Sequence, residues 1–378
     1  MAPIHTAIIG LSTAAKTSWA SAAHLPYLLS DRGRERFQIV ALLNSSVDSA
    51  KKAIADYKLG SDVKAYGSPQ DLAADKDVEF VVCATRVDVH YGTIKPSVAA
   101  GKDVFVEWPL AENVKRASEL AELAKEKQVT TAVGIQARVA PVVLKVKEII
   151  QSGAIGKVLC SEVKVFQPTV ERGRVSEGLS YFLDKKVGGN PVSIGYAHMI
   201  DFIHSILGEF EHFDSHTQLR RPAQVVYDTQ TGAERHTTSD VPDHVAVHGT
   251  LKPSTHVAEG ASLVVNFRTG APFPGTKVFV WVIEGDKGEI RVEADKSSFI
   301  QMEASNLAMP IEVHDYGTDK VDKVEWKWDD FLGALPARAR NIGRLYDLYA
   351  EGKLKEYGVA DFEAAVVRHR EIDRILWP

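Results

Sequence analysis

The sequence is poor in cysteine and contains no long apolar run, and both absences limit what the protein can be. Its 378 residues include only two cysteines, Cys83 and Cys160. Two cysteines cannot form a disulfide framework, so we expect a reducing, cytoplasmic setting. No apolar stretch reaches the roughly 18 to 20 residues of a membrane span, and the start of the chain lacks the pattern of a secretory signal. The sequence therefore predicts a protein that does not associate with membranes.

The sequence also has no large excess of charge of either sign. Lysine and arginine number 45 against 50 aspartates and glutamates, for a net charge of −5, which argues against a general electrostatic binder of nucleic acid. Hydrophobic content of 45% and charged content of 25% are globular values, so disordered and fibrous classes are excluded. A chain of this length exceeds one ordinary core, and we expect two domains.

Residues 1–136 alternate between short apolar runs and helical patterns. Between the runs, alanine and leucine recur every three or four residues, as in 47–57 and 112–127. Continuous apolar strands separated by helices are typical of a parallel sheet buried on both faces. We therefore predict an α/β, Rossmann-type dinucleotide-binding domain over 1–136. The expected strands are 4–9, 37–43, 78–84, 102–106 and 130–135.

From residue 137 the pattern changes to period-two alternation, with glycine-rich turns between the segments. Such alternation is typical of an antiparallel sheet with one open face. A helix is expected over 194–207, and further helical stretches at 339–350 and 362–375. We predict an α+β domain over 137–378, built on a large, mainly antiparallel open sheet, whose last helices either stay with it or pack back on the first domain. Its expected strands are 157–166, 244–251, 262–267, 278–283 and 289–292.

In an open parallel sheet the ligand lies outside the carboxyl ends of the strands, so the residues after each strand are candidates for a site. Gly10 follows the first run, and Ser12 and Ala15 fall near the other two glycines of a dinucleotide-binding fingerprint. Small residues there let backbone N–H groups approach a phosphate. Out of context a single glycine at a strand end is more often a plain turn, but its place on the first strand of a doubly wound sheet favours the dinucleotide.

After the second run stand Asn44 and Ser45, where an NAD enzyme usually has an acid for the ribose. Neutral donors, with Lys51 one turn later, favour a 2′-phosphate and hence NADP(H) over NAD(H). A helix N-cap at Ser46 explains the same loop, and both interpretations stay open.

The later runs are also followed by polar or aromatic residues. Arg86 is a candidate for an acidic substrate or a cofactor phosphate, or else a solvated loop residue. We assign nine residues to the cofactor site and no residue to a metal. The cofactor residues are Gly10, Ser12, Ala15, Asn44, Ser45, Thr85, His90, Glu107 and Trp108.

Four further segments, taken together and in order, resemble the glucose–fructose oxidoreductase, inositol dehydrogenase and MocA (Gfo/Idh/MocA) family. That family has a threonine at a strand end followed by histidine, a Gly-Lys-x-Val-x-x-Glu-Lys-Pro stretch, a Gly-Gly turn and a helix reading Asp-x-Gly-x-His-x-x-Asp. The resemblance implies a Rossmann domain followed by a domain that binds substrate. The matching segments here are Ala84-Thr85 with His90, Gly101-Lys102-Asp103-Val104-Phe105-Val106-Glu107-Trp108-Pro109, Gly188-Gly189, and His198-Met199-Ile200-Asp201.

Two departures from the family pattern bear on activity. The lysine that the resemblance makes a general acid beside the nicotinamide is Trp108 here, and the aspartate four residues before the histidine is Ile194. Within the family the pattern is most similar to the fungal galactose-pathway repressor, which implies a catalytically silent dinucleotide binder as the alternative to an enzyme. Trp108 is expected to roof an apolar pocket or lie against the nicotinamide, or simply to fill the space of the lysine stem.

We expect an NAD(P)-dependent oxidoreductase that moves a hydride between nicotinamide and a small carbonyl, imine or hydroxyl substrate. His198 can supply the proton that reduction of a carbonyl requires. Its pKa is expected at or below about 6.5, since only Asp201 could serve as its anionic partner. Tyr196 and Asp201 are the other two catalytic candidates. The expected substrate contacts are Trp108, Arg138, Tyr181 and His198.

An open sheet face rich in apolar side chains predicts a homo-oligomer. The alternating strands of the second domain supply more apolar side chains than one layer of helices covers. The resemblance implies pairing through this face as a homodimer or a dimer of dimers. The apolar residues in question are Ala246, Leu263, Val265, Phe279 and Trp281.

Overall fold

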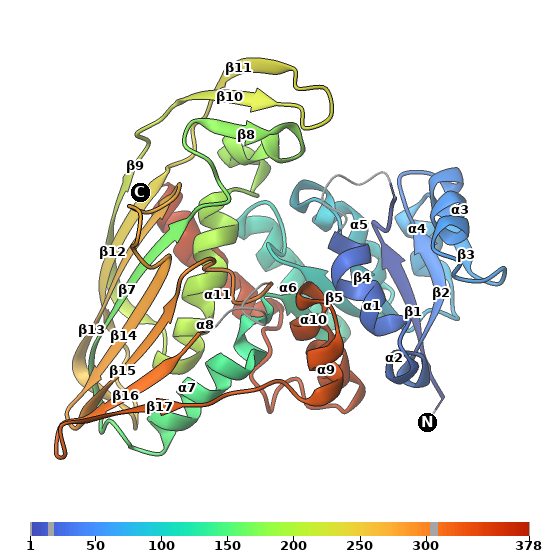
Figure 1. Ribbon diagram of the computed structural model, residues 1–378. Helices are drawn as coiled ribbons and strands as arrows, with labels where there is room; N and C mark the ends of the chain where they lie inside the picture. The colour runs from blue at the N-terminus through green and yellow to red at the C-terminus, as the bar shows by residue number, and fades with distance from the viewer. Residues whose placement is uncertain (1, 14–18, 303–308, 378) are drawn as a thin grey trace. The chain divides into compact units, whose positions relative to one another are not determined.

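The computed structural model describes residues 2–13, 19–302 and 309–377, and the chain divides into two compact units (Figure 1). The first unit contains Met1–Gln136, Lys186–Gly189 and Ala334–Asp373. The second contains Ala137–Lys185, Asn190–Gly333 and Arg374–Pro378. The stretch Ala334–Asp373, predicted within the second domain, is therefore counted with the first unit.

The first unit is built on a six-stranded sheet with the order β3-β2-β1-β4-β5-β6, in which every pair of neighbours is parallel. All four residues of β4 are buried, as expected for a strand covered by helices on both faces. The strands are β1 (Ile4–Ile9), β2 (Phe37–Leu43), β3 (Lys64–Tyr66), β4 (Phe80–Cys83), β5 (Asp103–Glu107) and β6 (Thr131–Gly134).

Local sequence signals explain where two of the longer helices of this unit begin. Ser46 accepts a hydrogen bond from the backbone N–H of Ser49 and starts α3, and Asn113 accepts one from Arg116 and starts α6. The helices are η1 (Ala20–His24, a π-helix), α1 (Leu25–Leu28), α2 (Asp31–Arg36), α3 (Val47–Asp56), α4 (Pro69–Ala74), α5 (Val87–Ala99), α6 (Val114–Lys127), α10 (Ala337–Ala350) and α11 (Phe362–Leu376), which is counted with this unit up to Asp373.

Helix α10 is attached to this unit by aromatic packing. The ring of Tyr349 stacks on Phe80 of β4 at a centroid distance of 4.2 Å. Tyr346 meets Phe37 of β2 edge to face at 5.1 Å and Phe105 of β5 at 5.9 Å. Aromatic contacts of this kind stabilise the packing of two elements by more than the burial of apolar area alone. They explain why a segment far along the chain belongs to the first unit.

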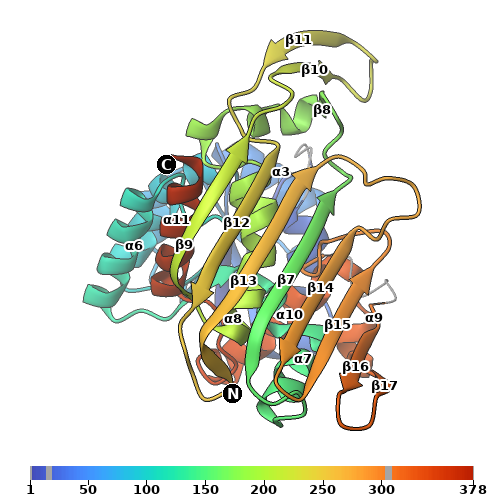
Figure 2. The ribbon, with the colours of Figure 1, turned by 90° about the vertical axis from the view of Figure 1, so that its left-hand side faces the viewer.

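The second unit is built on an eight-stranded sheet with the order β17-β16-β15-β14-β7-β13-β12-β9 (Figure 2). Only the β7–β13 pair is parallel, and the other neighbours are antiparallel. The strands are β7 (Val158–Gln167), β9 (Phe210–Gln218), β12 (His244–Leu251), β13 (Val257–Thr269), β14 (Phe279–Gly285), β15 (Gly288–Ala294), β16 (Ile311–Asp315) and β17 (Lys320–Val324).

One face of this sheet is covered by helices and the other is open, as Figure 2 shows. Phe202 of α8 (Ala197–Leu207) contacts Trp281 of β14 at 5.7 Å on the covered face. Most of the residues expected to form an exposed apolar patch are buried on that face, so this part of the prediction is wrong. The strand register explains this burial, because adjacent cross-strand pairs point to opposite faces of a sheet. Val265 pairs with Val247 on the covered face, and Ala246 pairs with Asn266 on the opposite face. The misplaced residues are Leu263, Val265, Phe279 and Trp281.

A three-stranded sheet and several short helices complete the second unit. No described helix is long and apolar enough to cross a membrane. The predicted fold class, a Rossmann domain followed by an α+β domain on a mainly antiparallel sheet, is confirmed. The remaining elements are η2 (Gln136–Val139), α7 (Pro141–Gln151), β8 (Arg174–Ser176), η3 (Glu177–Leu183), η4 (Lys185–Val187), η5 (Pro191–Tyr196, a π-helix), β10 (Ala223–Tyr227), β11 (Glu234–Thr238) and α9 (Asp330–Ala334).

Candidate functional site

Gly10 directly follows β1, where β1 and β4 lie side by side. Its φ is +95°, and a Cβ there would lie 2.5 Å from Cγ2 of Thr85 and 2.9 Å from the carbonyl oxygen of Ala84. Only glycine fits this approach. The sheet order also reverses between β1 and β4, and dinucleotides bind outside the carboxyl ends of strands at such a switch point. The residues present therefore fit a dinucleotide.

The rest of the turn after Gly10 is described in part. Ser12 is half-buried two residues further on. Ala15, with Ala14 and Lys16, lies outside the described residues. The assignment of Ser12 and Ala15 to the cofactor stays a prediction.

The loop after β2 is held by its own side chains. The amide Nδ2 of Asn44 donates to the carbonyl oxygens of Leu11, at 2.8 Å, and Ser49, at 3.3 Å. Ser46 is the N-cap of α3, as one of the two interpretations of this loop expected. Ser45 is exposed. The loop therefore offers the Ser45 hydroxyl to a ligand, while Asn44 ties together the turns after β1 and β2.

His90 is buried and joins the two loops that follow β4 and β5. Its Nδ1 lies 2.8 Å from the carbonyl oxygen of Pro109, and its Nε2 lies 2.9 Å from that of Thr85. Burial lowers the pKa of His90, and the two carbonyls and Glu107 oppose this shift. Because both ring nitrogens face backbone, His90 is placed to position Thr85 and the β5 loop. The expected direct contact between His90 and a cofactor stays a prediction.

Arg86 precedes α5 and forms an ion pair within its own loop. Its Nε and Nη2 each donate to a carboxylate oxygen of Asp88 at 2.6 Å. The pair lowers the pKa of Asp88, chiefly through the hydrogen bonds from Arg86. A loop ion pair is therefore what the structure shows for Arg86.

Glu107, the last residue of β5, is the buried acid of this edge of the sheet. Its Oε1 accepts a hydrogen bond from Nε2 of His24 at 2.9 Å. The other ring nitrogen, Nδ1 of His24, lies 2.8 Å from the hydroxyl of Tyr346. A Cβ on Gly134 would lie 2.3 Å from Oε2 of Glu107, so only glycine leaves room for the carboxylate. Sequence reasoning missed His24 and Tyr346.

Trp108 follows Glu107 and packs against a histidine of α11. The two ring centroids, of Trp108 and His369, are 4.6 Å apart. His369 is buried, and its Nε2 has no hydrogen-bond partner among the described residues. Burial, with a smaller contribution from His90, lowers the pKa of His369 to about 3. Trp108 therefore stands in a neutral, aromatic setting where the family has a lysine. Sequence reasoning missed His369.

In the second unit, His198 lies in the first turn of α8, directly after the π-helix η5. Asn190 starts η5, because its Oδ1 accepts hydrogen bonds from the backbone N–H groups of Val192 and Ser193. A π-helix has i→i+5 bonds and a wider turn than an α-helix. The α-helical spacing that put Ile194 on the face of His198 therefore does not apply. π-Helices are frequent at functional sites.

Asp201 lies three residues after His198 and is fully buried. Its two carboxylate oxygens accept hydrogen bonds from Nε and Nη2 of Arg138, each at 2.7 Å. Asp201 was expected to be the anionic partner open to His198, and Arg138 to contact substrate. The structure pairs the two with each other, and the catalytic assignment of Asp201 and the substrate assignment of Arg138 stay predictions. A bidentate pair of this kind fixes the start of the second unit to α8.

Tyr196 and Tyr181, the two tyrosines predicted to act in catalysis or to contact substrate, differ in burial. Tyr196 is fully buried at the end of η5 and meets Phe267 of β13 edge to face at 5.9 Å. Tyr181, in η3, is half-buried beside Phe182. Close packing surrounds η5, since a Cβ on Gly195 would lie 2.1 Å from Nε2 of Gln167. The catalytic and substrate assignments of Tyr196 and Tyr181 stay predictions.

The Gly188-Gly189 turn belongs to the first unit. Gly188 has a φ of +84°, and a Cβ there would lie 2.5 Å from Cα of Glu112, in the loop after β5. The turn therefore packs on the same loop that carries Trp108. The first unit thus gathers a glycine turn, an acid and an aromatic ring at the carboxyl edge of its sheet.

Comparison with known proteins agrees with this geometry. A family described as "Oxidoreductase family, NAD-binding Rossmann fold" matches residues 4–135, and one described as "Gal80p, C-terminal domain" matches 141–294. Dehydrogenase aclE of Aspergillus oryzae is 30% identical over 373 residues, which cover 99% of this chain and 95% of that protein. The regulatory protein GAL80 of Kluyveromyces lactis is 27% identical over 317 residues, 81% of this chain and 66% of that protein.

A solved structure shows the same fold over the whole chain. The super-repressor mutant of Gal80p from Saccharomyces cerevisiae superposes with a TM-score of 0.85 at 24% identity, and covers 99% of this chain and 95% of that one. Both halves of the sequence and the full-length relative point to one family, so the resemblance seen in the sequence is confirmed. The chain belongs to the Gfo/Idh/MocA oxidoreductase family, with an NAD(P)-binding Rossmann domain and a Gal80p-type C-terminal domain.

Proposed function

We propose that the protein is an NAD(P)-dependent oxidoreductase that transfers a hydride between nicotinamide and a small carbonyl, imine or hydroxyl substrate. One observation carries the proposal: a carboxyl edge of the Rossmann sheet where Gly10 permits close approach, Glu107 ends β5 and Trp108 follows it. The full-length likeness to a protein named as a dehydrogenase supports it. The bound dinucleotide would supply the hydride in reduction and accept it in oxidation.

The chain's own residues divide the remaining tasks. Gly10, Ser12 and Ser45 would hold the phosphates and ribose of the adenine half, and Thr85, Glu107 and Trp108 the nicotinamide half. His198 would exchange the proton with the substrate oxygen or nitrogen. Tyr196 is the next candidate for that proton. Trp108 would make its side of a substrate pocket apolar, which would favour a substrate with an apolar part.

Replacement of the family lysine by Trp108 is expected to slow the reaction without ending it. A lost charge stabiliser near the developing oxyanion costs on the order of 10² to 10³ in rate. A substrate that carries its own positive charge, such as an iminium ion, needs the lysine least. We therefore propose imines and conjugated ketones as the first compounds to try.

A turnover assay tests the proposed oxidoreductase activity. The protein is incubated with NADPH and a panel of ketones, aldehydes and imines, and the absorbance of reduced nicotinamide is followed. We expect slow turnover on at least one compound, and a fall in kcat of about 10² to 10⁴ in His198→Ala. Turnover that is unchanged in His198→Ala would remove His198 as the proton donor.

A silent dinucleotide-binding regulator is the second candidate. Two observations favour it: the aromatic Trp108 in place of the lysine, packed on a neutral His369, and the Gal80p-type domain over 141–294. Tight dinucleotide binding with no turnover on any compound of the panel would decide for the regulator.

A further inference from the structure

The carboxylate of Glu107 belongs to a buried hydrogen-bonded chain that runs from α10 through η1 to β5. Tyr346 and His24 are fully buried, and Glu107 is almost so. The chain joins the Tyr346 hydroxyl to Nδ1 of His24 and Nε2 of His24 to Oε1 of Glu107, at 2.8 and 2.9 Å. Its three members come from distant parts of the sequence, and all lie in the first unit.

The surroundings of Tyr346 decide where the protons of this chain lie. Its hydroxyl has no other hydrogen-bond partner among the described residues, and the rings around it include Tyr27, Phe37, Phe80 and Phe105. Burial and the charge of Glu107 hold the pKa of Tyr346 well above its usual range. The hydroxyl therefore keeps its proton and donates it to His24, because a buried hydroxyl without an acceptor is costly.

A histidine that accepts at Nδ1 must be the neutral tautomer with its proton on Nε2. That proton is donated to Glu107, so every donor and acceptor of the chain is satisfied with His24 uncharged. Glu107 forms no other ion pair among the described residues. The charge of Glu107 also acts on Cys83 and His90, and burial raises the pKa of Cys83 and lowers that of His90, which favours the neutral form of each.

We propose that the Tyr346–His24–Glu107 chain fixes one net negative charge at the end of β5, and that this charge favours oxidised over reduced dinucleotide. The inference rests on the proposed function, because it needs the nicotinamide half at the β4–β6 side of the sheet. Oxidised nicotinamide carries a positive charge on its ring and reduced nicotinamide does not. A carboxylate a few ångströms away stabilises only the charged form, and it does so strongly in a site with little water.

The test is the ratio of two dissociation constants, for NADP⁺ and NADPH, measured by calorimetry at fixed pH and salt. In Glu107→Gln we expect NADP⁺ to weaken relative to NADPH by about tenfold or more. Glu107→Asp disturbs the same contact with His24 but keeps the charge, and should change the ratio much less. His24→Lys places a fixed cation beside the carboxylate and should move the ratio in the same direction as Glu107→Gln.

Asp103 gives a matched control at the other end of the same strand. Its carboxylate also accepts hydrogen bonds, from the Tyr349 hydroxyl at 2.8 Å and the backbone N–H of Thr130 at 2.7 Å. It lies four residues away, about 13 Å along the strand, so Asp103→Asn should leave the ratio unchanged. A ratio that is the same in wild type, Glu107→Gln and His24→Lys overturns the inference while the proposed function stands. Wild-type protein that binds neither dinucleotide overturns both.

Discussion

At the scale of the residue, His369 is a histidine that the fold keeps uncharged. Burial lowers its pKa to about 3, with a further contribution from His90. The pKa in the folded protein is thus below the ordinary value near 6.5 that the unfolded chain retains. Between about pH 6.5 and 3 the unfolded chain holds a proton that the folded protein does not, so the free energy of unfolding rises with pH in this window.

Replacing His369 by phenylalanine should therefore reduce the sensitivity of the protein to acid. We expect the free energy of unfolding of the wild type to fall by roughly 1 to 2 kcal/mol more than that of His369→Phe between pH 7 and pH 5. Urea unfolding at several pH values measures the difference. His236, exposed on β11, gives the control, and His236→Phe should follow the wild type. Parallel curves for wild type and His369→Phe would contradict the prediction.

The residues after each strand could be predicted from sequence, but their partners could not. Position after a strand is a local property, so Gly10, Thr85 and Glu107 were found by order alone. His24 lies 83 residues before Glu107 in the sequence. Tyr346 lies 322 residues after His24. No spacing signal links residues so far apart. Their pairing depends on the way α10 packs on the sheet.

At the scale of the element, the turn after β1 is controlled by the distance between β1 and β4. Gly10→Ala would place a Cβ 2.5 Å from Thr85 in a backbone conformation that L-residues rarely adopt. The turn must then move, and we expect at least about a tenfold loss of dinucleotide affinity. Gly101 also has a positive φ but no atom within 4 Å of a Cβ, so Gly101→Ala should keep the affinity. Equal affinities of wild type and Gly10→Ala would remove this cofactor site.

The loop after β2 is where we expect the preference between the two dinucleotides to be set. We propose NADP(H), because Ser45 is exposed and the sequence has no acid between the end of β2 and Asp48 to repel a 2′-phosphate. Ser45→Asp should weaken NADP(H) by about 10- to 100-fold and favour NAD(H), since it puts two like charges in contact. Ser61→Asp, exposed after α3, adds the same charge elsewhere and should have little effect. A wild type that prefers NAD(H) would refute the proposal.

The long strands and helices could be predicted because their burial repeats with a clear period. β1, β2 and β12 have the bounds that the sequence predicted. The short edge strands β3 and β17 were missed, since exposed and polar residues give no such period. The π-helices η1 and η5 were missed as well, because their widened turn depends on packing around Ala20–His24 and Pro191–Tyr196.

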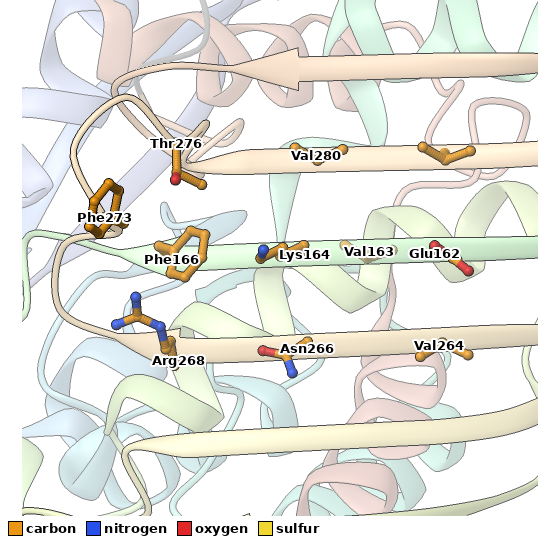
Figure 3. A pocket seen from close by; sticks show the side chains of 11 residues that line it. Glu162, Val163, Lys164, Phe166, Val264, Asn266, Arg268, Phe273, Thr276 and Val280 are labelled. Atoms are coloured by element: carbon orange, nitrogen blue, oxygen red, sulfur yellow. The ribbon is translucent and has the colours of Figure 1, made fainter.

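At the scale of the whole molecule, the open face of the eight-stranded sheet carries positive charge toward one end. Arg268 of β13 and Lys164 of β7 both lie over the ring of Phe166, at 4.3 and 5.5 Å (Figure 3). Partial burial lowers the pKa of Arg268, and the nearby Arg172 and Arg220 add to the shift. Cations are therefore gathered at the carboxyl end of β7.

The other end of the same face is negative. Cys160, near the start of β7, donates from Sγ to Glu284 of β14 at 3.1 Å. Partial burial, together with the charges of Glu284, Glu162 and Glu289, raises the pKa of the Cys160 thiol to about 11. These carboxylates therefore lie close together, on the face that also holds Lys164 two residues beyond Glu162.

An apolar depression of about 690 Å³ lies on this face along the middle strands. Figure 3 shows Phe166, Val264 and Val280 within it, and Phe273 beside its positive end. Phe273 is 79% exposed and Val264 is 40% exposed. An exposed apolar surface of this kind, rimmed by charges, is typical of an interface. The patch expected from the sequence therefore exists, but it is made of other residues.

We propose that a second copy of the chain covers this face in a two-fold dimer. A two-fold axis through the face brings the positive end of one copy against the negative end of the other, twice over. The apolar depression then lies near the centre of the interface, shielded from water. We expect a light-scattering mass near twice 41.4 kDa at micromolar concentration.

Two charge reversals test the orientation of the pair. Arg268→Glu should set two acidic ends against each other, and Glu284→Lys should do the same with two basic ends, so each variant alone should dimerise at least about tenfold more weakly. Mixed in equal amounts, they should form a heterodimer, because each end of one variant again meets the opposite charge of the other. Val321→Glu, exposed on the edge strand β17, adds a charge outside the depression and should leave the mass unchanged. A wild type of 41.4 kDa, or two variants that stay monomeric when mixed, would refute this dimer.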